Sequence, residues 1–375
     1  MRARSTALVL ASICISALGA IAPDTGLLAA HLGRFRGHQD HEISAPEYRS
    51  IHEEYLAWID TRIKKGASLA SVNAELETAG LLSNGAESSD EMFNKSFTGY
   101  VSKLEEQPGL APAGLRAISV GMYTGVYCNF DQTIVLYDRA TSSRVAYVNA
   151  QQSFQHGYLL RALAVSPEGP GGRVIASIWV ASNCSSNWNG DILRLEKIRG
   201  SSRVNILERP VDAFGGIEAK VSIVGEVVTF RWGTSAGDTV VLSRDAIARY
   251  RLSGPTAVRI APIAESFGAF VDEWLKLDDQ QAARWSTPEA AIAHRKLDAH
   301  NQIFEWQSVA DCPGSPPFRE ITVEWSDSKK KTVFAVSGSR VEDLRMLAIR
   351  DRPSVGCREI DISGDASALM AQPKR

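Results

Sequence analysis

The sequence predicts an α+β protein that is mainly antiparallel β, with an N-terminal helical unit followed by a large β-meander domain. Two observations carry this prediction. From residue 117 onward, short runs rich in Val, Ile, Tyr and Trp alternate with Gly, Asn, Asp and Ser. The connections between these runs are too short for the helical crossovers that a parallel sheet needs. Before residue 110, apolar residues instead recur every three or four positions, as in amphipathic helices.

Composition places the chain among ordinary globular proteins. Of 375 residues, 44% are hydrophobic and 22% are charged, which excludes a mostly disordered chain and a fibrous repeat. Lys and Arg number 41 against 43 Asp and Glu, a balance that gives no sign of a nucleic-acid partner. The sequence holds neither a G-x-G-x-x-G nor a P-loop, so we expect no nucleotide and no cofactor.

Residues 1–22 have the pattern of a signal peptide. Arg2 and Arg4 precede an uncharged run, Ser5 to Ala22, with an apolar centre of suitable length. Cleavage after Gly19, Ala20 or Ala22 leaves the site open. We therefore expect an exported protein, periplasmic or extracellular, and the alternative is an uncleaved N-terminal membrane anchor.

The elements that follow fall into four segments. Residues 23–43 predict a linker, and residues 44–110 a helical unit. In that unit, Ser44 and Pro46 begin a helix that ends at Gly66, and further helices span 68–80 and 89–106. Residues 111–362 predict the antiparallel β domain, with helices near 266–277 and 287–297. Residues 363–375 are small and polar and predict a flexible tail.

The β domain divides into short strands that form meanders. Two four-strand meanders are expected, at 158–207 and 219–260, and such units suggest propeller-like blades or a sandwich. The predicted strands are 133–137, 145–148, 158–165, 174–181, 192–198, 219–224, 227–232, 239–242, 248–252, 257–260, 302–308, 319–325, 332–337, 344–350 and 358–362.

Cysteine usage agrees with export. Without the signal peptide, Cys128, Cys184, Cys312 and Cys357 remain, and four cysteines allow three pairings. We predict two disulfides, with Cys312–Cys357 bracketing consecutive antiparallel strands and Cys128–Cys184 following by elimination. The alternative is four buried thiols. No C-x-x-C occurs and no His lies at zinc-ligand spacing, so we expect no metal site.

Several segments carry a resemblance. They are Ser182–Asn189, Arg249–Arg251, Phe270–Leu275 and the closing Cys312 and Cys357. Together they are similar to uncharacterised exported proteins of soil bacteria, over about half the chain, from Val174 to Cys357. That group has no known activity, so the resemblance implies export and common ancestry, and no chemistry.

One pentapeptide formally matches a nucleophile motif. Gly233 to Gly237 is a G-x-S-x-G, and Asp272, Asp298, His294 and His300 lie downstream. In α/β-hydrolases the Ser at its centre opens a helix. Here β-branched residues follow, so we interpret Ser235 as a hairpin-turn residue and assign no catalytic residue.

Carboxylates provide no clear site. Glu320 and Glu324 are four apart on a predicted strand, so both are expected on its polar, outward face. The segment from Ser182 to Gly190 is the best candidate for ligand contact, through Asn187, Trp188 and Asn189. An aromatic ring with amide side chains suits a sugar or a peptide. The alternative is that Trp188 packs on a disulfide and the Asn residues form turns.

We conclude that the sequence predicts a non-enzymatic binding or interaction module of the cell envelope or exterior. Its partner is expected to be a cell-envelope protein or glycan. The alternative is a secreted hydrolase acting on a polysaccharide or ester, which would need two carboxylates in one cleft or Ser235 beside His300. A third hypothesis is a structural protein of the envelope, with an exposed apolar patch.

Overall fold

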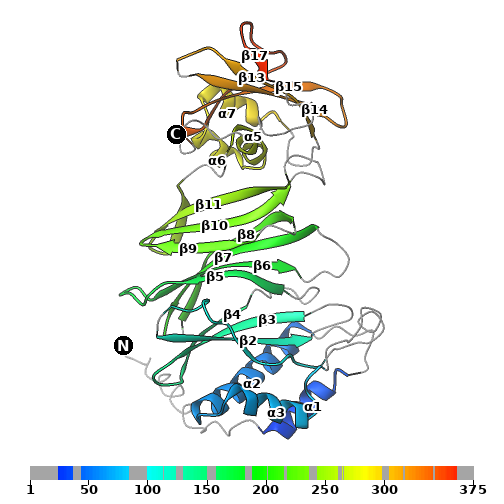
Figure 1. Cartoon of the computed structure of the whole chain (residues 1–375), viewed down its shortest axis with the longest axis vertical. Helices are drawn as coiled ribbons and strands as arrows, with labels where there is room; N and C mark the ends of the chain where they lie inside the picture. Colours follow the sequence, from blue (N-terminus) through cyan, green and yellow to red (C-terminus); the bar gives the residue numbers. More distant parts are fainter. Residues whose placement is uncertain are drawn as a thin grey trace, which may run out of the picture.

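The chain is mainly antiparallel β, built as open sheets stacked along its long axis (Figure 1). Helices cover one end of the stack, and a second group of helices lies between the third and fourth sheets (Figure 1). The computed structural model describes residues 24–36, 44–83, 99–112, 114–123, 130–149, 158–181, 188–200, 202–214, 218–235, 243–260, 264, 266–297, 304–315, 317–340 and 343–360. No helix in these ranges is both long and apolar enough to cross a membrane.

The first layer joins three helices to a four-stranded sheet with the order β1-β2-β3-β4. Its elements are α1 (Thr25–Gly33), α2 (Ala45–Lys64), α3 (Leu69–Thr78), β1 (Glu105–Glu106), β2 (Leu115–Tyr123), β3 (Phe130–Asp138) and β4 (Arg144–Asn149). The sequence predicted Ser44 as the cap of α2, and in the structure Ser44 forms a capping box with Glu47, which was not predicted. Helices and sheet share one core, in which Trp58 packs with Val120 and Val135.

Two parts of the N-terminal prediction differ from the structure. The predicted linker contains α1, which Asp24 caps and which buries Leu28 and Leu32, four residues apart on one face. The predicted helix over 89–106 does not continue through its last residues. Val101 forms bridges with Leu82 and Met122, and β1 follows it. Residues 84–98 lie outside the described residues.

The second and third sheets are the two predicted meanders. Their strands are β5 (Tyr158–Val165), β6 (Arg173–Ala181), β7 (Trp188–Arg199), β8 (Ser202–Phe214), β9 (Lys220–Val224), β10 (Val227–Ser235), β11 (Ser243–Ser253) and β12 (Thr256–Arg259). Sequential strands pair antiparallel in both sheets. Pro210 is tolerated in β8 because this strand lies at the edge of its sheet.

The fourth layer packs three helices on a five-stranded sheet with the order β16-β15-β14-β13-β17. Its elements are α5 (Phe267–Leu275), α6 (Asp279–Arg284), α7 (Pro288–His294), β13 (Phe304–Cys312), β14 (Phe318–Trp325), β15 (Lys331–Ser337), β16 (Arg345–Arg350) and β17 (Arg358–Ile360). Trp274 of α5 and Phe334 of β15 are both fully buried in the shared core. The two predicted inserted helices are thus present as α5 and α7, and α6 was missed.

Strand alternation divides the cores between layers. On β3, Val135 and Tyr137 face the helices, whereas Ile134 and Leu136 face the second sheet. A further core lies between the second and third sheets and includes Ile178 and Phe230. Because both faces of the inner sheets are covered, polar groups between layers must find partners there.

Candidate functional site

A pocket of about 390 Å³ lies where the edge of the second sheet, the third sheet and α5 meet. Its volume falls in the range of small-molecule sites, roughly 300–1,000 Å³. Its wall comes from β7, β8, β10 and the C-terminal end of α5. The lining residues are Gly190, Arg209, Pro210, Val211, Trp232, Thr234, Glu273 and Lys276.

The local sequence explains how α5 brings its charges to this wall. Ser266 caps the helix by accepting a hydrogen bond from Ala269 N at 3.2 Å. Phe270 and Trp274 are buried in the core of the fourth layer. Glu273, beside Trp274 in sequence, is directed instead toward β8 and β12, where it meets two arginines.

Three charged side chains and Tyr250 form a connected group beside the pocket and are here called the pocket cluster: Arg209, Tyr250, Arg259 and Glu273. Of these, Arg209 and Glu273 line the pocket. Glu273 Oε1 lies 3.2 Å from a guanidinium nitrogen of Arg259 and 3.5 Å from one of Arg209. Arg209 also donates to Tyr250 Oη at 3.4 Å. Burial lowers the pKa of Arg259 to about 10, against the opposing effect of Glu273. Arg259 is therefore the inner partner, 4% exposed, and Arg209 the outer one, 25% exposed.

The two segments singled out in the sequence both reach this pocket. Trp188 and Asn189 begin β7 directly before Gly190, and their backbones pair with Phe214 and Ala213. Gly190 is in the pocket wall. Asn187 lies outside the described residues, and the structure describes only the backbone of Trp188 and Asn189, so their predicted ligand contacts stay a prediction.

The G-x-S-x-G segment also contributes to the pocket wall. Its Thr234 lines the pocket and is 4% exposed. Ser235 is the last residue of β10 and pairs with Ser243 of β11, so the segment connects two antiparallel strands. A nucleophile elbow would connect a strand to a helix. Ser235 therefore lies in a strand of a β-hairpin and not in its turn, where the sequence had predicted it. The connecting residues 236–242, with the predicted strand 239–242, lie outside the described residues.

The downstream acid and histidine candidates have other partners. Asp272 lies 3.7 Å from Lys276 Nζ, one turn further along the chain. His294 Nδ1 lies 2.8 Å from Asp279 Oδ1, and its ring packs edge-on against Trp274. His300 and Asp298 lie outside the described residues. Among the described lining residues, Glu273 contributes the one carboxylate.

A second polar group is enclosed between α2 and the first sheet and is here called the core cluster: Tyr48, His52, Asp131, Thr133 and Asn149. The Tyr48 hydroxyl donates to Asp131 Oδ2, and Asn149 Nδ2 donates to the same oxygen at 2.6 Å. His52 Nε2 lies 2.8 Å from Thr133 Oγ1. Asp131 is 1% exposed, and its Oδ1 has no hydrogen-bond partner among the described residues.

Burial controls the titration of the core cluster. It raises the pKa of Asp131 to about 7, although hydrogen bonds from Tyr48 and Asn149 act in the opposite direction. It lowers the pKa of His52 to about 4. Both shifts disfavour the charged form of the side chain, as desolvation does, and for His52 burial outweighs the opposing effect of Glu53.

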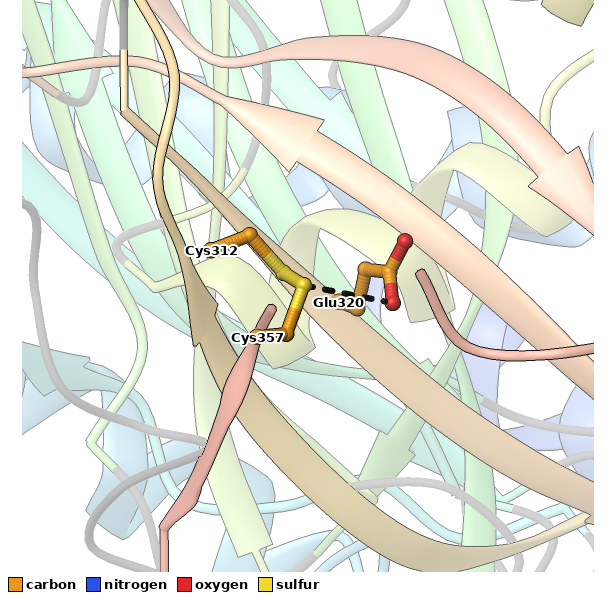
Figure 2. Close-up of side chains that lie close together, drawn as sticks. All are labelled: Cys312, Glu320 and Cys357. Atoms are coloured by element: carbon orange, nitrogen blue, oxygen red, sulfur yellow. Dashed lines mark hydrogen bonds between the residues drawn. A yellow bond between two sulfur atoms is a disulfide. The ribbon is translucent and has the colours of Figure 1, made fainter. Parts of the chain in front are cut away.

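The third candidate is a disulfide beside a buried acid. Cys312 and Cys357 form the predicted disulfide, and their sulfurs and a Glu320 oxygen lie within 4.8 Å of one another (Figure 2). Disulfide sulfurs are not thiolates, so this trio does not offer a zinc-type ligand set. Cys128 and Cys184 lie outside the described residues, so the predicted disulfide between them stays a prediction.

Glu320 corrects one prediction. It was expected on an exposed polar face, and it is 1% exposed. Arg350 donates to it at 2.7 Å, and Ser354 donates to it through its backbone N–H at 2.8 Å and its hydroxyl at 2.6 Å. The segment after β16, tied to β13 by Cys357, covers this face of the sheet, which a single strand's alternation could not indicate.

Sequence reasoning did not identify Arg209, Arg259 or Lys276 as site residues. A usable signal was the Asp272–Glu273 pair inside an apolar helix, because buried acids need basic partners. No family model, no curated protein and no solved structure matches this chain. The resemblance to uncharacterised exported proteins of soil bacteria stays a prediction.

Proposed function

We propose that this protein is an exported, non-enzymatic binding module of the cell envelope or exterior that takes a sugar unit of a glycan into the pocket between β8, β10 and α5. The observation that carries the proposal is the pocket itself. Its wall joins the start of β7, where Trp188 and Asn189 lie, to Thr234 and to the cations Arg209 and Lys276.

The lining suits a small polar ring. Sugar recognition uses hydroxyl and charged groups for the ring hydroxyls, and apolar surface for the C–H face. Thr234 and Arg209 supply the first kind of contact, and Val211 and Trp232 the second. The mixed lining favours a sugar over a fully apolar ligand.

Gly190 allows a sharp test of the site. A Cβ built on Gly190 would meet no atom within 4 Å, so Gly190→Leu fills the pocket without a backbone clash. Gly33→Leu is the matched control, because Gly33 has equally open surroundings at the end of α1. Isothermal titration with D-galactose, N-acetyl-D-glucosamine and D-galacturonate should detect binding to the wild type and to Gly33→Leu, and none to Gly190→Leu.

Two results would count against this function. Absence of binding by every sugar in the panel contradicts it, and so does binding that Gly190→Leu leaves unchanged. Release of product from an oligosaccharide or from p-nitrophenyl acetate would support the alternative, a secreted hydrolase.

Export is part of the proposal. The Cys312–Cys357 disulfide supports it, since disulfides persist in oxidising compartments and are rare in the cytosol. The charged start and apolar run of residues 1–22 support it as well. Intact-mass measurement of the protein recovered from the periplasm or medium of a bacterial host tests it, and retention of Met1 would contradict a cleaved signal peptide.

We further propose that the sheets are related as propeller-like blades. The support is that three successive four-strand meanders, β1–β4, β5–β8 and β9–β12, stack face to face in chain order. A crystal structure tests this relation. A constant rotation between successive sheets about one axis is expected, and two sheets packed as an isolated pair would instead indicate a sandwich.

A further inference from the structure

We infer that the sugar unit taken by this pocket is acidic, and that its carboxylate binds Arg209 and Lys276. This inference rests on the proposed binding function and names the chemical class of the ligand. It starts from the charge of the pocket wall. Two lining side chains are cationic, Arg209 and Lys276, and one is anionic, Glu273.

Glu273 lies closer to Arg259 than to Arg209. Its Oε1 is 3.2 Å from Arg259 and 3.5 Å from Arg209. Arg259 is 4% exposed and needs a counter-charge, because an unpaired buried cation is costly. Glu273 therefore balances Arg259, and Asp272 lies 3.7 Å from Lys276. One net positive charge remains among Arg209, Arg259, Lys276, Glu273 and Asp272.

Arg209 has hydrogen-bonding capacity left over. A guanidinium carries five N–H donors. Within the described part of the chain, its contacts are Tyr250 Oη at 3.4 Å and Glu273 Oε1 at 3.5 Å, both longer than the usual 2.7–3.2 Å of an N–H···O bond. A carboxylate entering the pocket can form shorter, bidentate bonds with this fork.

Lys276 provides the second charge from the opposite wall. It caps α5 at its C-terminus and is 38% exposed, so its ammonium group can follow a ligand. Asp272 lies 3.7 Å from it and holds it near the pocket mouth. With Arg209 on β8 and Lys276 after α5, an anion would be held between two separate elements.

Two competing ligand types fit less well. A neutral sugar would leave the guanidinium of Arg209 with only its long contacts to Tyr250 and Glu273 on desolvation. A fully apolar ligand would cover Arg209 and Thr234 without replacing their hydrogen bonds to water. An acidic sugar satisfies the arginine with its carboxylate and places its ring against Val211 and Trp232.

The test compares two sugars that differ at one carbon. D-galacturonate carries a carboxylate where D-galactose carries a hydroxymethyl group. Isothermal titration of the full chain should show D-galacturonate binding about tenfold more tightly or better, which is what one charge-assisted hydrogen bond supplies. Raising NaCl from about 0.02 M to about 0.3 M should weaken the binding of D-galacturonate and leave the binding of D-galactose unchanged.

Arg209→Gln should remove most of the preference for D-galacturonate over D-galactose, and Lys276 should keep the remainder. Arg249→Gln is the matched control, since it removes one arginine from the third sheet outside the pocket wall, and it should keep the difference between the sugars. Equal affinity for both sugars, abolished by Gly190→Leu, would overturn the acidic ligand and leave the binding function standing. Failure of both sugars to bind would overturn both.

Discussion

The pocket cluster and the core cluster each contain a buried carboxyl group, but the two groups have different kinds of partner. Glu273 lies between two guanidinium groups and borders a pocket. In the described part of the chain, Asp131 accepts hydrogen bonds from two neutral donors, Tyr48 and Asn149, and it lies enclosed under α2. The comparison leads to a rule within the proposed function: the buried acid that borders the pocket is the one accompanied by cations, which can also interact with a ligand.

The largest change in stability is expected for Asp131→Asn, which removes the titrating carboxyl group of the core cluster. A raised pKa means that the folded protein holds this proton more tightly than the unfolded chain. The stability that it contributes is therefore present below about pH 4 and is lost as the pH rises to about 7. Asp131→Asn should remove this loss, about 1.4 kcal/mol per pH unit across that window.

Urea unfolding of the wild type and Asp131→Asn between pH 4 and pH 8 measures this difference. His52 acts in the opposite direction, because its lowered pKa costs stability as the pH falls from about 6.5 to about 4. That effect is common to both proteins and cancels in the difference. Parallel stability curves for the two proteins would show that Asp131 is charged and paired like Glu273.

The next largest loss of stability is expected when the ion pairs of the pocket cluster are broken. Glu273→Gln leaves the buried guanidinium of Arg259 without its counter-charge and should lower the free energy of unfolding by about 3 kcal/mol. Chemical denaturation at pH 7 measures it. Glu77→Gln, at an exposed position of α3, is the control and should change stability by less than about 0.5 kcal/mol. A similarly small change for Glu273→Gln would contradict its structural role.

Removing one neutral donor from the core cluster should have a smaller effect. Tyr48→Phe deletes the hydroxyl that donates to Asp131 and should cost about 1–2 kcal/mol at pH 8, where the carboxylate is charged. The cost should shrink toward pH 5 as Asp131 becomes protonated. Tyr147→Phe, whose hydroxyl donates to the exposed Glu53, is the comparison. A cost that is independent of pH would argue against the link to Asp131.

The smallest stability effect is expected for the outer arginine. Arg209→Gln should cost less than about 1 kcal/mol, since Arg209 is partly exposed and its contacts are long. Arg259→Gln should cost about 3 kcal/mol, because it isolates Glu273 in the interior. Equal losses from the two variants would show that Arg209 is structural and would weaken its assignment to the ligand.

The strands were predictable because their burial is visible in the sequence. A strand buried on one face has apolar residues at every second position, and a strand buried on both faces has a continuous apolar run. β5 was expected at 158–165 and has those bounds. β8 was missed as a listed strand, since its centre, Glu208-Arg209-Pro210, reads as a turn. An edge strand tolerates both the charges and the proline.

The pocket could not be predicted in the same way. Gly190, Arg209, Thr234 and Glu273 are far apart in the chain and meet only because sheets and a helix stack. The sequence pointed to the segments at Trp188 and Ser235 for local reasons, and each touches the pocket through its neighbour, Gly190 or Thr234. Local sequence patterns therefore pointed to two segments that border the pocket. The charged side chains of the pocket are brought together by long-range packing, which local patterns do not show.

The most direct test of the central claim is a crystal structure of the full chain soaked with D-galacturonate. The account predicts the sugar in the pocket between β8, β10 and α5, with its carboxylate within about 3 Å of Arg209 and Glu273 still bonded to Arg259. A sugar bound elsewhere on the chain, or a pocket that stays empty at saturating sugar, would contradict it.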